Sequence, residues 1–67
     1  MKITRTLEVT SPETFEADRP EFEARLRAFH ELAQEQAGVA LSFVMDAAPV
    51  FDAEDGFWSI SATMEAV

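Results

Sequence analysis

The sequence predicts an α+β fold, in which one main helix covers one face of a three-stranded sheet in the order β-α-β-β. Three observations lead to this prediction. Residues 2–10 and 57–66 alternate between apolar and polar side chains, as half-buried strands do. Residues 22–33 repeat apolar side chains at helical spacing, and residues 39–46 alternate again. A chain of 67 residues is the length of one small domain, which we place at 1–67.

The first strand, residues 2–10, has one apolar face and one polar face. Ile3, Leu7 and Val9 lie on the apolar face, because side chains alternate along a strand. Arg5 falls on the same face and interrupts it.

Two start signals precede the helix. Ser11 followed by proline is typical of an N-cap and first turn. Pro20 would clash inside a continuous helix, so we expect a short helical turn at 12–17 and then the main helix at 19–37. Gly38 stands where a glycine usually ends a helix.

The main helix is predicted to be amphipathic. Phe22, Leu26, Phe29 and Ala33 form a stripe that Leu32 widens, and this stripe would face the sheet. Oppositely charged residues four apart support the helix from its other side; they are Glu21 with Arg25 and Glu23 with Arg27.

The last two strands, 39–46 and 57–66, should pair antiparallel, with 57–66 in the centre because it is the longest. The sheet face away from the helix would then carry small and mostly hydroxyl side chains: Thr4, Thr6, Ala40, Ser42, Val44, Ser59, Ser61 and Thr63. Two interpretations stay open. This Thr/Ser face meets water, as antiparallel sheets often do, or it packs against a second copy to form a homodimer.

Residues 46–56 are expected to form a long acidic loop between these strands, with Pro49 and Gly56 as breakers. Phe51 lies inside it among carboxylates. Either Phe51 folds back over the edge of the core, or it is an exposed aromatic anchor ringed by charge, as binding hot spots are.

The net charge of -8 is unevenly distributed along the chain. Residues 1–27 contain all five bases and six of the acids, whereas residues 28–67 contain seven acids and neither Lys nor Arg. A surface built from the second half would repel nucleic acid and anionic membranes. We therefore expect a protein partner with a basic surface, no direct nucleic-acid binding and no membrane binding. A GC-rich genome or a need for solubility would also explain the acidity.

No constellation of catalytic or metal-binding residues is visible, so we expect no enzyme, no metal and no cofactor. His30 and Glu31 resemble the start of a zinc-protease helix, but position 34 is Gln and no second His exists. Counted from Asp52, an EF-hand loop would need glycine and glutamate where Phe57 and Thr63 stand. No glycine-rich phosphate loop occurs among the two glycines.

The chain has no cysteine, no apolar run of about 20 residues and no signal-peptide pattern behind Met1. These absences favour a cytoplasmic protein, which for a phage-encoded chain means the cytoplasm of the host cell.

In size, acidity and lack of catalytic groups, the chain resembles phage-encoded inhibitors of the anti-CRISPR and DNA-mimic type. This resemblance implies a viral, non-enzymatic inhibitor or adaptor that occupies the basic surface of a nucleic-acid-handling machine. The residues that we expect to bind the partner are Phe51, Asp52, Glu54, Asp55, Glu31 and Glu35. The chain also resembles ferredoxin-like half-domains, which implies as the alternative a homodimeric ligand-binding module that pairs through the Thr/Ser face.

Overall fold

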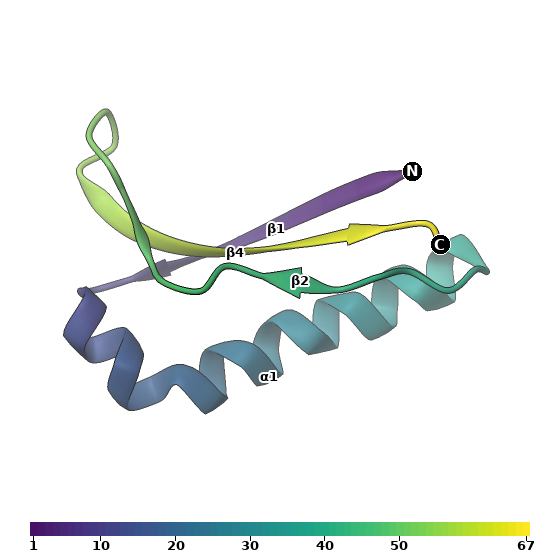
Figure 1. The fold of residues 1–67 in the computed structure, drawn as a ribbon, viewed down its shortest axis with the longest axis horizontal. Helices are drawn as coiled ribbons and strands as arrows, with labels where there is room; N and C mark the ends of the chain where they lie inside the picture. The colour runs from purple at the N-terminus through teal and green to yellow at the C-terminus, as the bar shows by residue number, and fades with distance from the viewer.

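The computed structural model describes all 67 residues and confirms the α+β fold (Figure 1). Strand β1 (Lys2–Val9) leads into helix α1 (Pro12–Ala37), and strands β2 (Val44–Met45), β3 (Val50–Asp52) and β4 (Phe57–Glu65) follow. The helix lies along one face of the sheet (Figure 1). The sheet has four strands instead of three, because part of the expected 46–56 loop forms β3.

Strand β4 is the centre of the sheet, as predicted from its length. It pairs antiparallel with β1 along one side and with β2 and β3 along the other. The register places Leu7 opposite Ile60 and Val9 opposite Trp58, so apolar side chains of both strands share one face. The outer edge of β1 has no partner strand.

The predicted break in the helix is wrong, since α1 is one helix of 26 residues that contains Pro20. Figure 1 shows the helix axis bending in its first third, and Pro20 explains the bend because proline cannot donate the usual backbone hydrogen bond. The Ser11 hydroxyl accepts from the backbone N–H of Thr14, and Gly38 ends the helix in the left-handed region at φ 70°. Both predicted caps are therefore confirmed.

The core lies between the helix and the faces of β1 and β4. Its central residues are fully or nearly fully buried and all apolar: Leu7, Val9, Phe15, Leu26, Ile60 and Ala62. Phe15 comes from the first helical turns, which bend toward the sheet, and its ring lies 5.6 Å from that of Phe22. Sequence periodicity picked out Leu26 but not Phe15.

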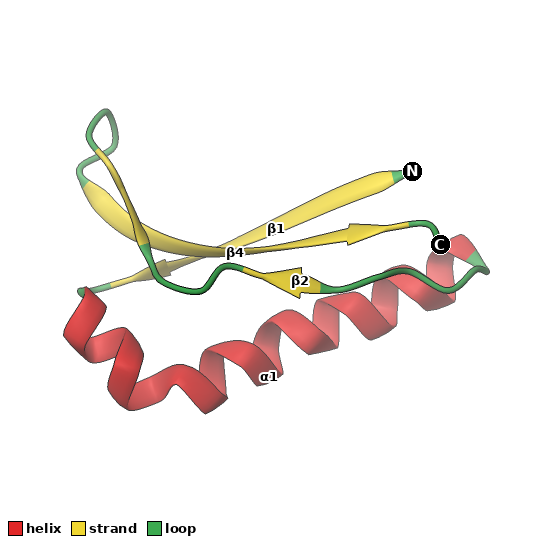
Figure 2. Cartoon of the chain, viewed as in Figure 1, coloured by secondary structure: helices red, strands yellow, loops and turns green.

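The strand predicted at 39–46 is mostly irregular. Figure 2 shows this segment as a loop that runs from the helix end to the short strand β2, and only Leu41 makes an isolated bridge, to Ala66. The backbone of Leu41 bonds instead to the helix: its N–H donates to Gln34 Oε1 at 2.9 Å, and its carbonyl accepts from His30 Nε2 at 2.7 Å. Helix side chains thus occupy backbone groups that a regular ladder would use.

No helix of the structure is long and apolar enough to cross a bilayer.

Candidate functional site

The first candidate surface is the hairpin of β3 and β4, which replaces most of the expected acidic loop. The Asp52 carboxylate accepts from the backbone N–H groups of Glu54 and Asp55 at 2.9 and 3.2 Å. The N–H of Gly56 bonds to the carbonyl of Asp52, and Gly56 has φ 75°. Asp52 therefore shapes the turn, whereas the side chains of Glu54 and Asp55 are exposed and make no ion pair.

Phe51 combines features of both interpretations that the sequence left open. Its ring packs edge to face against Trp58 at 5.3 Å, and Trp58 in turn packs against the core. Even so, 49% of Phe51 is exposed. The Phe51 ring thus packs on Trp58 while about half of the residue remains accessible to solvent, and it precedes the turn that carries the carboxylates.

The structure does not bring the six predicted partner-binding residues together. Glu31 and Glu35 are exposed and belong to the C-terminal half of α1. Figure 1 shows this half of the helix and the turn between β3 and β4 at opposite ends of the molecule. Phe51, Glu54 and Asp55 form one surface, which we call the hairpin surface, and the two helix carboxylates form another.

Few of the carboxylates are neutralised by bases. The helix pairs Arg27 with Glu23 at 3.0 Å, as predicted, and Arg19 with Glu16. The predicted pair of Glu21 with Arg25 does not form. Because no Lys or Arg follows Arg27 in the sequence, nothing on the hairpin itself offsets its negative charge.

The Thr/Ser face of the sheet is open, as expected for the residues in its regular strands. Thr6 and Ser61 hydrogen bond to each other across β1 and β4 at 2.8 Å, which satisfies part of their hydroxyl capacity. Val44 lies opposite Thr63 on this face and is exposed. Ala40 and Ser42 precede the regular strand β2, and Ser42 lies beside β4, where its N–H donates to the carbonyl of Glu65 at 2.7 Å.

His30 is explained by its role in packing. It and Gln34, one helical turn later, together hold the backbone of Leu41. Its ring also lies 5.3 Å from the ring of Phe43. The spacing that resembled a zinc-protease helix thus fastens the loop after the helix, and no three His, Asp or Glu side chains gather where they could hold a metal ion.

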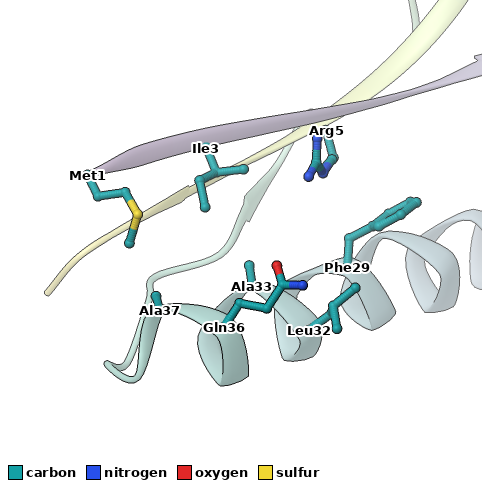
Figure 3. Close-up of a pocket in the computed structure, with 8 residues that line it drawn as sticks. All are labelled: Met1, Ile3, Arg5, Phe29, Leu32, Ala33, Gln36 and Ala37. Carbon is teal, nitrogen blue, oxygen red and sulfur yellow. The ribbon is translucent and has the colours of Figure 1, made fainter.

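The one cavity of the structure lies elsewhere, at a place that sequence patterns barely indicate. It is an open cleft of about 200 Å³ between the first half of β1 and the second half of α1 (Figure 3). Its walls are mostly apolar, from Met1, Ile3, Phe29, Leu32, Ala33 and Ala37. Arg5 is its only charged residue, and the interruption of the apolar face by Arg5 was the one available signal.

Comparison of the chain with models of protein families, with curated proteins and with solved structures finds no match.

Proposed function

We propose that this protein is a non-enzymatic inhibitor or adaptor that binds a basic, nucleic-acid-handling protein through its hairpin surface. The observation that carries the proposal is the half-exposed ring of Phe51, which packs on Trp58 and belongs to the same hairpin as the exposed residues Glu54 and Asp55. A rigid aromatic side chain loses little entropy on binding, and aromatic anchors dominate the energy of many interfaces. The nature of the partner follows from charge and from the resemblance to anti-CRISPR proteins.

Charge supports a basic partner rather than nucleic acid or membrane. The chain carries -8, and its hairpin contains acids only. Such a surface attracts Arg and Lys side chains and repels phosphate. Carboxylates at the rim of an interface mainly raise the association rate, and salt weakens this effect by screening. Phe51 would contribute affinity, and Glu54 and Asp55 would raise the association rate and the selectivity for a basic partner.

The test compares three variants with the wild type, two that alter the surface charge and one that removes the Phe51 ring. The double variant Glu54→Lys with Asp55→Lys reverses the hairpin charge, and Phe51→Ala removes the anchor. The matched control, Glu31→Lys with Glu35→Lys, makes the same charge change at the opposite end of the molecule. Immobilised wild-type protein captures partners from host extract. Surface plasmon resonance then measures the association and dissociation rates of each captured protein with the wild type and with every variant.

We expect a basic protein that binds the wild type and the helix control alike. The hairpin double variant should associate at least about tenfold more slowly, and Phe51→Ala should dissociate faster. Raising the salt from about 50 to 500 mM should slow association for the wild type far more than for the hairpin variant. Capture of no basic protein, or equal loss of binding in the helix control, would contradict the proposal.

One observation favours the alternative of a homodimeric ligand-binding module. Val44 and Val50 are exposed on the Thr/Ser face, where a second copy would cover them. Sedimentation at rising concentration tests this alternative, since Val44→Lys should abolish any dimer formed through that face. A monomer at every concentration would exclude it.

A further inference from the structure

Arg5 occupies an unusual position. Strand β1 places it on the face that the helix covers, opposite the fully buried Ala62 and two residues from the buried Leu7. Arg5 itself is nevertheless exposed, because its side chain lies at an open cleft between the strand and the helix. The proposed function does not explain why an arginine stands in this place.

The guanidinium of Arg5 has no carboxylate or hydrogen-bond partner in the protein. It makes no ion pair and no hydrogen bond, and it lies 5.8 Å from the centre of the Phe29 ring. Arg19 and Arg27, by contrast, are both paired with glutamates. Lys2 and Arg25 also form no ion pair, but Arg5 is the one of these three that lines the cavity.

The cleft beside Arg5 combines an apolar lining with one charged side chain. Figure 3 shows Arg5 extending from β1 toward Phe29 at one end, while Met1 and Ala37 lie at the other end. Ile3 forms the strand side and Ala33 the helix side between them. Ligand sites combine apolar walls with a few polar groups that fix orientation. Here the single charged side chain is that of Arg5, and the Gln36 amide is the one other polar side chain.

We propose that this cleft binds a small monocarboxylate with an apolar tail. The carboxylate pairs with the Arg5 guanidinium, whose fork of N–H groups suits two carboxylate oxygens. The tail lies between Ile3 and Ala33 and points toward Met1. Phe29 and Leu32, which are 37% and 50% exposed, lose contact with water when the ligand binds.

The volume limits the ligand to a short chain. A cavity of about 200 Å³ corresponds to roughly seven water molecules at liquid density. Octanoate, with about ten non-hydrogen atoms, fills such a space while its head remains at the open mouth. At a typical binding energy per atom, a ligand of this size binds with a Kd of about a millimolar.

The experiment is a titration of the uniformly ¹⁵N-labelled protein with sodium octanoate, followed by two-dimensional NMR. We expect the amide shifts to change around the cleft, at Ile3, Phe29 and Ala33, and nuclear Overhauser contacts between the octanoate tail and the Ala33 methyl group. Octanamide, which has the same shape without the charge, should bind about tenfold more weakly.

Two variants and one control test whether Arg5 is the group that binds the octanoate carboxylate. Arg5→Gln should raise the Kd for octanoate about tenfold and bind octanoate and octanamide equally. Leu32→Glu, which leaves Arg5 in place but adds a carboxylate at the mouth, should also weaken octanoate binding. Arg25→Gln is the matched control, because it removes an arginine that does not line the cleft, and it should leave the Kd unchanged.

Several results would overturn the proposal. Equal affinity for octanoate and octanamide in the wild type would show apolar adsorption without carboxylate recognition. The same Kd in Arg5→Gln would exclude Arg5 as the binding group. If the amide shifts of the cleft residues change with protein concentration in the absence of ligand, the cleft is occupied by a second copy of the protein. If Arg5→Gln self-associates and the wild type binds no octanoate, Arg5 only protects the free edge of β1 from pairing. The hairpin variants do not touch the cleft, so this test is independent of the proposed partner.

Discussion

The contribution of Phe15 to stability can be measured against Phe29, a second phenylalanine on the same helix. Phe15 is fully buried, whereas Phe29 is 37% exposed beside the open cleft. Replacing a buried phenylalanine by alanine costs about 3–5 kcal/mol of stability, because the cost of the empty cavity adds to the lost transfer free energy of the ring. For Phe29 the loss is about 1.5 kcal/mol, since only two-thirds of a burial energy of about 2 kcal/mol is at stake and the cleft is already open.

Urea unfolding followed by circular dichroism measures the difference. A domain of 67 residues has an unfolding free energy of about 3–10 kcal/mol, and its urea dependence is about 1 kcal/mol per molar. Phe15→Ala should therefore unfold at a urea concentration about 2 M lower than Phe29→Ala does, or be unfolded without urea. In the latter case Phe15→Leu, with an expected loss of about 1–1.5 kcal/mol, supplies the measurement. Equal losses for Phe15→Ala and Phe29→Ala would refute the view that the bent first turns of the helix carry a central core residue.

Three further substitutions test local features by the same unfolding assay. Gln34→Ala leaves the backbone N–H of Leu41 without its partner and should cost about 1–3 kcal/mol of stability. The control Glu35→Ala, at an exposed neighbouring position, should cost under about 0.5 kcal/mol. Similar losses for both variants would contradict the role of Gln34. Gly38→Ala should cost about 1 kcal/mol because φ is 70° there, and no loss would show that the helix ends in another way. Ser11→Ala removes the N-cap and should cost about 1 kcal/mol, while Ser11→Asp should restore most of that loss.

The structure separates the six residues predicted to bind a partner into two regions. Sequence reasoning grouped Phe51 with Glu54 and Asp55, which belong to the same hairpin because they are close in sequence. It also grouped them with Glu31 and Glu35 on the basis of charge sign alone. Shared sign carries no information on distance, and the fold places the helix carboxylates at the other end of the molecule.

The sequence by itself determined the elements whose signals are local. The alternation of 2–10 and 57–66 predicts β1 and β4, and the serine and glycine caps bound α1. The length of 57–66 was enough to place β4 at the centre. These predictions succeed because periodicity and capping depend on the residues within each segment.

Only the tertiary structure decided the features that depend on distant partners. The helix continues through Pro20 with a bend, and the bent turns bury Phe15 against strands that come before and after them in the sequence. Strand β3 is three residues long, too short for a periodic signal, and it exists because the edge of β4 offers it hydrogen-bond partners. The cleft at Arg5 arises where α1 and β1 lie apart. No local pattern encodes the angle between a helix and a sheet, since that angle is set by the packing of side chains from both.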